Sequence, residues 1–244
     1  MMIFWNYIYA PFAAALILVW TLICSSIAFA VSFSANTARH NAVIAVWARF
    51  IIFLIRVDVE VFDKDKLPKT GCLLLFNHLS LLDIPLIYYA LGSDFRFGAK
   101  IELFSIPVFG HALKRYGFLP IERNNRANTL NTYAEAKERS LRGEKFILAP
   151  EGTRQTELKL GSFKSGPFIL AIQAQIPITP VVISGPEIIC PKNKLIPVLN
   201  KRVACKVKVL DTIATNNVPI DDRNKIKDIA WKNMNTALVD LMGE

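Results

Sequence analysis

A histidine and an aspartate lie five residues apart at a point where the chain changes from apolar to polar. The apolar run Cys72 to Phe76 is followed by Asn77 and His78, and then by Ser80 and Asp83. This pattern predicts a strand, a loop and a helix, with Ser80 as the N-cap and Asp83 as the carboxylate of a capping box. Such a carboxylate turns back toward the preceding chain, where it can contact one ring nitrogen of His78. The other ring nitrogen would then be available as a general base.

The same spacing has a simpler explanation when it is considered alone. A loop histidine beside an ordinary helix cap would give the same residues, and short motifs of this kind often occur by chance. The choice between a catalytic pair and a structural cap therefore depends on the rest of the chain.

Two further polar loops follow short extended runs. Glu122 and Arg123 come after residues 117–121, and Glu151-Gly152-Thr153-Arg154 comes after residues 146–149. If these runs are parallel neighbours of the strand before His78, all three loops meet at one edge of the sheet. Arginine forks and a glycine that allows close backbone approach suit phosphate oxygens. The combination predicts a base beside a phosphate-binding cluster.

Other kinds of chemistry lack the residues that they need. No Gly-x-Ser-x-Gly segment supports a hydrolase serine, and Pro167-Phe168 stands where a P-loop requires Lys and Ser or Thr. The four cysteines show no paired spacing, which predicts reduced thiols and no metal site. The net charge of +9 favours an anionic partner, either anionic lipid or an acidic carrier. Nucleic acid is the weaker choice, because no basic cluster is interleaved with aromatic residues.

The first 57 residues predict a membrane anchor. Residues 1–38 contain no charged side chain, and Phe12 to Phe33 is long enough to cross a bilayer as a helix. A second apolar stretch, residues 42–57, carries Arg49 and Arg56 on one helical face. Because buried charges are costly, this stretch lies in the interface or forms the second arm of a hairpin. The arginines that follow the first apolar run place the remainder on the cytoplasmic side.

Strand and helix patterns alternate over residues 58–244. We expect strands at 57–61, 72–76, 95–99, 117–123, 146–149, 178–183 and 202–210, the last as an edge strand, and helices at 80–91, 128–142, 164–175 and 222–241. This alternation predicts an α/β domain with a mixed, largely parallel sheet flanked by helices and preceded by the membrane segment. Ligands of such sheets bind beyond the carboxyl ends of the strands.

Several blocks between residues 72 and 186 together resemble a known family. They are Asn-His-Leu-Ser-Leu-Leu-Asp at 77–83, residues 99–103 with 106–110, residues 117–123, Pro-Glu-Gly-Thr-Arg at 150–154, and residues 161–166 and 176–181. In this order and spacing they resemble the glycerophosphate and lysophospholipid acyltransferases, most closely the bacterial 1-acylglycerol-3-phosphate acyltransferases. The first block carries the His-x4-Asp motif of that family.

The resemblance implies an enzyme of phospholipid biosynthesis in the inner membrane, with its catalytic domain on the cytoplasmic face. It would transfer a fatty acyl group from acyl-CoA or acyl-ACP to the free hydroxyl of 1-acylglycerol-3-phosphate, without a metal or further cofactor. The residues that the resemblance assigns are the catalytic pair His78 and Asp83, and a substrate-binding set of Lys100, Arg123, Glu151, Gly152, Thr153 and Arg154.

Alternatives remain for the acceptor and for turnover itself. Ala149 and Gln155 stand where the family commonly has an aromatic residue and a serine, which bears on acyl-chain or acceptor preference. The acceptor could instead be glycerol-3-phosphate, a lyso-ornithine lipid or another lysophospholipid. A membrane-anchored scaffold that binds lipid or carrier protein without turnover is the alternative from a different class.

Overall fold

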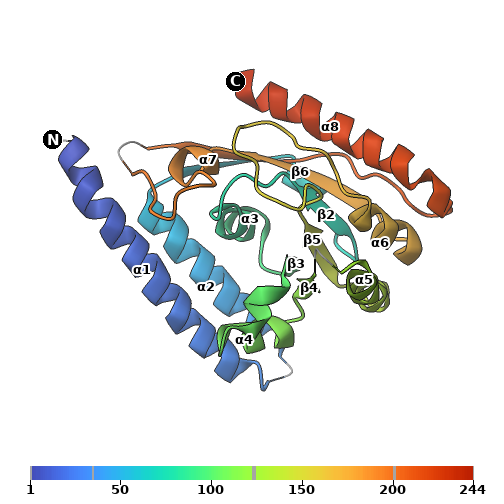
Figure 1. Cartoon of the computed structure of the whole chain (residues 1–244), viewed down its shortest axis with the longest axis horizontal. Helices are drawn as coiled ribbons and strands as arrows, with labels where there is room; N and C mark the ends of the chain where they lie inside the picture. The colour runs from blue at the N-terminus through green and yellow to red at the C-terminus, as the bar shows by residue number, and fades with distance from the viewer. Residues whose placement is uncertain (1, 35, 123–124, 200–201, 244) are drawn as a thin grey trace.

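The protein is a seven-stranded sheet covered by helices on both faces (Figure 1). The computed structural model describes residues 2–34, 36–122, 125–199 and 202–243. The strands, listed in chain order, are β1 (Asp58–Phe62), β2 (Leu73–Phe76), β3 (Phe95–Lys100), β4 (Leu119–Ile121), β5 (Lys145–Leu148), β6 (Ile178–Ser184) and β7 (Ala204–Val209). The helices are α1 (Met2–Val31), α2 (Thr37–Ile55), α3 (Asp83–Leu91), α4 (Phe109–Arg115), α5 (Arg126–Leu141), α6 (Gly166–Ala174), α7 (Pro186–Ile189) and α8 (Arg223–Gly243), with short 3-10 turns at Lys64–Lys66, Ile101–Ser105 and Ile220–Asp222.

The spatial order of the strands is β1-β7-β6-β2-β5-β3-β4. The pairs β6·β2, β2·β5, β5·β3 and β3·β4 are parallel, β7 is antiparallel to β6, and β1 is parallel to β7. The expectation of an α/β protein with a mixed, largely parallel sheet is therefore confirmed. The carboxyl ends of β2, β5, β3 and β4 lie at one edge of the sheet, because these strands run in the same direction.

The prediction that the last strand is an edge strand is wrong. β7 pairs with β6 on one side and with β1 on the other. Its sequence alternates because Cys205, Val207 and Val209 are buried, whereas Lys206 and Lys208 lie on a part-exposed face. Alternation of basic and apolar residues thus indicates that one face of the strand meets water. It does not indicate how many neighbouring strands pair with it.

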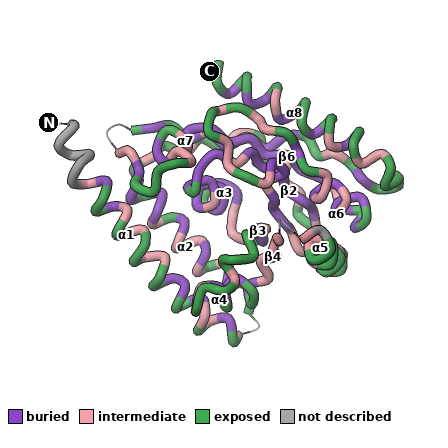
Figure 2. The backbone as a smooth tube through the Cα atoms, viewed as in Figure 1, coloured by how far each residue is buried: buried purple, intermediate pink, exposed green. Residues whose placement is uncertain are grey.

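The central strands are apolar throughout because each of their faces contacts a separate helical layer. Leu74 and Phe76 of β2 pack in the core on the side of α2 and α3, whereas Leu73 and Leu75 pack on the side of α5, α6 and α8. All four residues of β2 are buried, as are all seven of β6. The buried stretches run through the middle of the molecule (Figure 2). The sheet therefore gives the loops at its edge a rigid base.

The two N-terminal helices form a hairpin that packs against the α/β part of the chain. Tyr9–Val31 and Thr37–Ile55 are long and apolar enough to cross a membrane by length and composition, with mean hydropathies of 2.4 and 1.5. The Trp47 indole donates to Thr21 Oγ1 at 3.1 Å and joins the two helices. Ala48 and Ile51 of α2 share a core with Leu86 of α3. The apolar segment thus continues into the layer that supports α3.

Candidate active site

The side chain of His78 contacts Asp83 directly. His78 Nδ1 lies 2.7 Å from Asp83 Oδ2, and the same oxygen accepts the backbone N–H groups of Leu79 at 2.8 Å and Ser80 at 2.9 Å. Asp83 is fully buried, whereas the His78 side chain keeps 16% of its surface exposed. Because a carboxylate accepts hydrogen bonds, the proton of the neutral imidazole lies on Nδ1 and the lone pair on Nε2. The arrangement is an oriented imidazole with a free basic nitrogen.

The local turn differs from the predicted helix cap. α3 begins at Asp83, three residues after the predicted N-cap Ser80. Pro85 explains the later start, since proline has no N–H and fits only the first turn of a helix. Ser80 Oγ instead accepts the N–H of Leu82 at 3.1 Å and donates to Cys190 O at 2.7 Å. The predicted return of the Asp83 carboxylate to the preceding chain is nevertheless present.

Asn77 fixes the loop before His78 to the neighbouring strand. Its fully buried side chain donates to Ile183 O at 2.9 Å and accepts the N–H of Ile183 at 2.8 Å. The amide thereby continues the β2·β6 hydrogen-bond ladder for one more position after β2 ends. In the sequence, the position of an amide side chain at a strand end is the one sign of this contact.

Glu151 joins the loop after β5 to the backbone of His78. Its Oε1 accepts the N–H of His78 at 2.9 Å, and its Oε2 accepts the N–H of Gly161 at 2.8 Å. The carbonyl of His78 in turn accepts the N–H of Gln155 at 2.8 Å. Glu151 is 3% exposed, and this burial raises its pKa, while the two N–H donors oppose the shift. The predicted meeting of these two loops is confirmed.

Gly161 is a further site component that the sequence did not reveal as such. A Cβ atom at this position would lie 2.5 Å from Gln155 Nε2 and 2.8 Å from Glu151 Oε2. The Trp231 indole of α8 donates to Gly161 O at 3.0 Å, so the same residue is held from both sides. Only a residue without a side chain permits this close approach.

Among the described residues expected to bind phosphate, Gly152, Thr153 and Arg154 follow β5, and Lys100 ends β3. Gly152 adopts a left-handed φ of 70°, and Thr153 is exposed. Arg154 is half-buried, and within the described ranges its buried Nη1 has no hydrogen-bond partner. The pKa of the Cys190 thiol is raised by burial and lowered by the charge of Arg154, which places that charge near the residue that accepts from Ser80. The charge of Arg154 thus acts on Cys190, whose carbonyl contacts the loop between His78 and Asp83.

Lys100 and the loop after β4 lie farther along. Lys100 ends β3, two strands from β2, and its exposed Nζ is 2.9 Å from Glu102 Oε1. Arg123 lies outside the described residues. Glu122 accepts from Asn128 Nδ2 at 2.6 Å and follows β4, three strands from β2, or roughly 14 Å at the usual strand spacing. Lys100 and Glu122 share the edge with His78, and no hydrogen bond or ion pair among the described residues joins either of them to it.

The parts of the chain that the structure describes contain no cluster of side chains suited to metal binding. No group of three or more His, Cys, Asp or Glu residues there is arranged to hold a metal ion. The four cysteines are free and buried. Burial raises the pKa of the Cys72 thiol to about 12, and that of Cys205 to about 12. Both thiols are therefore protonated at neutral pH and poorly nucleophilic.

The fold and this geometry define an α/β protein that presents an oriented imidazole beyond the carboxyl edge of its sheet. The sequence model of the acyltransferase family matches residues 58–184, which is more than half of the chain and includes His78, Asp83 and residues 150–154. The protein belongs to this family of acyltransferase enzymes.

Individual relatives agree with the family. Over 199 residues the chain is 31% identical to a 1-acyl-sn-glycerol-3-phosphate acyltransferase of Saccharomyces cerevisiae, covering 78% of this chain and 62% of the relative. Over 153 residues it is 29% identical to the chloroplastic 1-acyl-sn-glycerol-3-phosphate acyltransferase BAT2 of Brassica napus, covering 62% of this chain and 44% of the relative. The chain thus spans less than two thirds of the length of either protein.

A solved structure shows the same fold. The crystal structure of the 1-acyl-sn-glycerophosphate (LPA) acyltransferase PlsC from Thermotoga maritima superposes with a TM-score of 0.81. The match covers 100% of this chain and 99% of that protein, at 22% sequence identity. The arrangement of two N-terminal helices and a seven-stranded sheet is therefore shared over the whole chain.

Proposed function

We propose that this protein transfers a fatty acyl group from acyl-CoA or acyl-ACP to the free hydroxyl of 1-acylglycerol-3-phosphate, forming phosphatidic acid for phospholipid biosynthesis. The observation that carries the proposal is the 2.7 Å contact of His78 Nδ1 with Asp83 Oδ2, which leaves Nε2 as a base at the sheet edge. The choice of acceptor is supported by the names of the yeast and Brassica relatives.

His78 Nε2 removes the proton of the acceptor hydroxyl as its oxygen attacks the thioester carbonyl. Asp83 stabilises the imidazolium that results. When the tetrahedral intermediate collapses, the carbon–sulfur bond breaks and the imidazolium returns its proton to the leaving thiolate. The acyl group passes directly from the thioester sulfur to the acceptor oxygen, so no acylated residue forms. General base catalysis of this type contributes about 10² to 10⁴ in rate.

The acceptor phosphate is assigned to the loop after β5. Arg154 offers a guanidinium whose buried Nη1 lacks a partner in the described part of the chain, and Gly152 and Thr153 precede it. Arg123 and Lys100 complete the proposed set of cations. Glu151 has a different role in this proposal, because backbone N–H groups occupy both of its oxygens and its charge would repel phosphate. It positions His78.

Residues 1–57 act as the membrane anchor and residues 58–244 as the acyltransferase domain in this proposal. The apolar character of α1 and α2 supports this division, because a membrane anchor holds the domain near its lipid acceptor. The anchor sits in the inner membrane and the domain faces the cytoplasm, where acyl-CoA and acyl-ACP are available.

An acceptor screen tests the proposed reaction. The purified protein in detergent receives oleoyl-CoA with lysophosphatidic acid, glycerol-3-phosphate, a lyso-ornithine lipid or lysophosphatidylcholine, and products are identified by mass spectrometry. We expect the fastest acylation with lysophosphatidic acid. Faster acylation of any other acceptor would contradict the assigned substrate, and an Arg154→Gln variant with unchanged KM for lysophosphatidic acid would contradict the assigned phosphate contact.

A further inference from the structure

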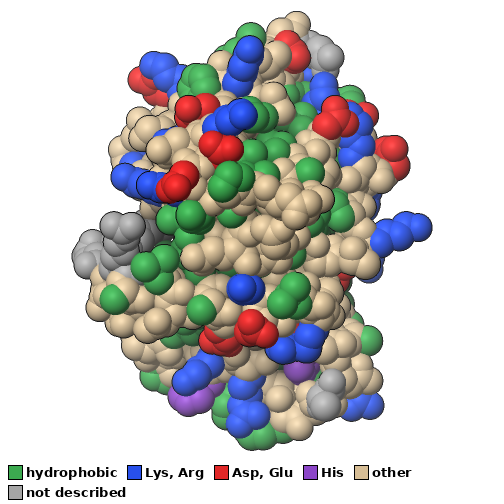
Figure 3. All heavy atoms as spheres, turned by 90° about the vertical axis from the view of Figure 1, so that its right-hand side faces the viewer, with side chains coloured by type: hydrophobic (Ala, Val, Ile, Leu, Met, Phe, Trp, Pro, Cys, Tyr) green, Lys and Arg blue, Asp and Glu red, His purple; other side chains and the backbone are tan. Residues whose placement is uncertain are grey.

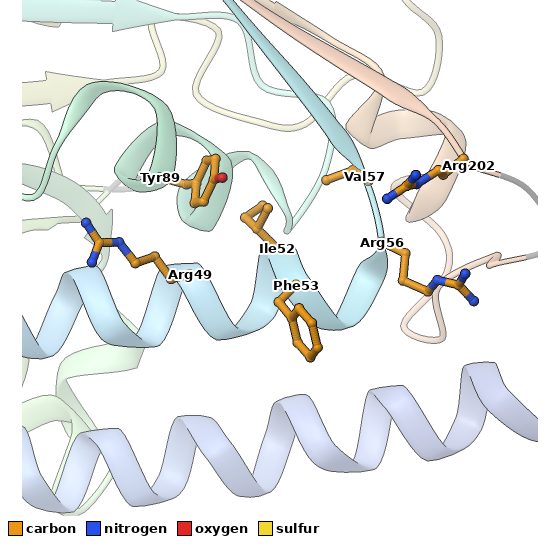
Figure 4. A pocket seen from close by; sticks show the side chains of 7 residues that line it. All are labelled: Arg49, Ile52, Phe53, Arg56, Val57, Tyr89 and Arg202. Atoms are coloured by element: carbon orange, nitrogen blue, oxygen red, sulfur yellow. The ribbon is translucent and has the colours of Figure 1, made fainter.

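A hollow of about 300 Å³ lies between α2, α3 and the segment that leads into β7. Three arginines line it: Arg49 and Arg56 from the α2 region and Arg202 from before β7 (Figure 4). The residues of the candidate active site do not line it. Tyr89, which does, comes six residues after Asp83 on α3, or about 9 Å along the helix axis. The hollow is therefore separate from the site of acyl transfer.

The charge around the hollow is unbalanced. Arg56 and Arg202 lie at one end, and Arg49 lies at the other (Figure 4). Among the described residues, the recorded ion pair of these arginines is Arg202 Nε with Asp58 Oδ1 at 3.5 Å, and both side chains of that pair are more than half exposed. Within the described ranges, the ion pairs of this lining thus include one carboxylate for three guanidinium groups, and that carboxylate contacts Arg202. Such a concentration of positive charge attracts an anion.

The exposed face of α2 favours a lipid over a soluble anion. Val46, Arg49, Phe53 and Arg56 follow one another at intervals of three and four residues and are all exposed, so they form one stripe. Phe53 keeps 78% of its surface exposed beside two cations. A phenyl ring is unfavourable in water and a guanidinium is unfavourable in hydrocarbon. Both are accommodated at headgroup depth, where phosphate and acyl chains adjoin.

The surface of α1, beside the hollow, also favours contact with lipid. α1, which packs beside α2, has only 17% of its most apolar segment buried within the molecule. By contrast, the face toward the right of Figure 1 shows acidic and basic side chains interspersed (Figure 3). Two cations of the hollow, Arg49 and Arg56, thus belong to the α2 region, which packs beside the largely unburied apolar surface of α1.

We propose that this hollow binds the phosphate headgroup of an anionic membrane phospholipid as a structural ligand. The guanidinium groups of Arg56 and Arg202 hold the phosphate oxygens, Arg49 adds positive charge at the other end, and Phe53 packs against the acyl-glycerol part. The bound lipid fixes the depth at which α2 meets the membrane. This assignment does not depend on the identity of the acyl acceptor.

Lipid binding by the full-length protein in detergent tests the proposal by native mass spectrometry. Phosphatidylglycerol is titrated onto a protein with Arg154→Gln, so that the proposed acceptor site does not contribute. Added to this background are either Arg56→Gln with Arg202→Gln, or a matched pair, Lys225→Gln with Lys232→Gln. The matched pair removes the same charge from exposed positions on α8. The four side chains of the two pairs are exposed, and thermal unfolding checks that each variant is folded.

The arginine pair is expected to weaken phosphatidylglycerol binding at least about tenfold, as loss of one charge-assisted hydrogen bond implies. The lysine pair should leave binding unchanged. Equal binding by both pairs would overturn the proposal. An equal loss of phosphatidylcholine binding by the arginine pair would also overturn it, because the site would then have no preference for anionic lipid. Displacement of the lipid by inorganic phosphate would overturn it as well, because the site would then bind soluble anions. The readout contains no acyl donor, so it is unaffected if the proposed reaction fails.

Discussion

Replacement of Asp83 by asparagine separates the charge of this residue from its geometry. Three donors meet at Asp83 Oδ2, namely His78 Nδ1 and the N–H groups of Leu79 and Ser80. An asparagine in the same rotamer can satisfy all three only with its carbonyl oxygen in that position, because its NH₂ group would oppose two backbone donors. The NH₂ group then takes the position of Oδ1, which has no partner among the described residues. The tautomer of His78 is thereby preserved while the negative charge is lost.

The size of the effect follows from the lost charge. Two full charges about 4 Å apart interact by about 4 kcal/mol at an effective dielectric constant of about 20. If the imidazole has gained about half of its positive charge in the transition state, the loss is about 2 kcal/mol, or about 30-fold in kcat. The three donors keep their acceptor, but the NH₂ group that replaces Oδ1 is buried without a partner among the described residues, so the free energy of unfolding should fall by about 1–3 kcal/mol. Asp83→Ala is a poor substitute, because it strands three buried donors at about 1–3 kcal/mol each.

The assay is acyl transfer in detergent by wild type, Asp83→Asn and His78→Ala, with thermal unfolding measured on the same preparations. Asp83→Asn should fall between the other two in kcat. A rate equal to that of His78→Ala would refute the reasoning that backbone donors fix the amide orientation. A rate equal to that of the wild type would refute the electrostatic role of Asp83.

Three further predictions concern the loop that holds His78. Glu151→Gln leaves the N–H of His78 or Gly161 unpaired and should lower the free energy of unfolding by about 1–3 kcal/mol. Glu157→Gln, on the exposed part of the loop, is the control. Equal stability of the two variants would argue against a stabilising role for the two hydrogen bonds of Glu151. Burial raises the pKa of Glu151 in the folded state, so the folded protein holds this proton more tightly than the unfolded chain does. As pH rises from about 4.3 through the folded-state pKa, the free energy of unfolding of the wild type should therefore fall relative to that of Glu151→Gln. An opposite slope in pH-dependent unfolding would contradict this. Gly161→Ala should reduce kcat while the chain stays folded, because its Cβ displaces Gln155 and Glu151, whereas Gly243→Ala meets nothing within 4 Å and should behave as wild type.

The sequence predicted the local parts of this site well because they depend on neighbours in the chain. His78 and Asp83 are five residues apart, and the contact between them follows from a turn that any isolated peptide of this sequence could attempt. Even there, the start of α3 was misplaced, because the restriction imposed by Pro85 was outweighed by the apparent capping box. The buried strand at 72–76 was recognisable from its continuous apolar run.

The sequence predicted that the loops of His78 and Glu151 meet only if their strands are neighbours, and the individual long-range contacts were beyond what it could specify. Glu151 accepts from the backbone of a residue 73 positions away, and Asn77 pairs with Ile183 over 106 positions. Both contacts depend on the order β6-β2-β5 in the sheet, and apolar runs of similar composition do not encode which of them are neighbours. The substrate-binding role of Glu151 is implied by the family resemblance and stays a prediction, and the sequence gives no sign that both of its oxygens accept backbone N–H groups.

The central claim is that His78 is the base for acyl transfer. Its most direct test is phosphatidic acid formation by the purified protein with lysophosphatidic acid and oleoyl-CoA, beside His78→Ala prepared in the same way. We predict product from the wild type and a rate lower by about 10² to 10⁴ from the variant, with the variant still folded in thermal unfolding, since backbone contacts hold the loop of His78 in place. Equal rates from the two proteins would contradict the claim.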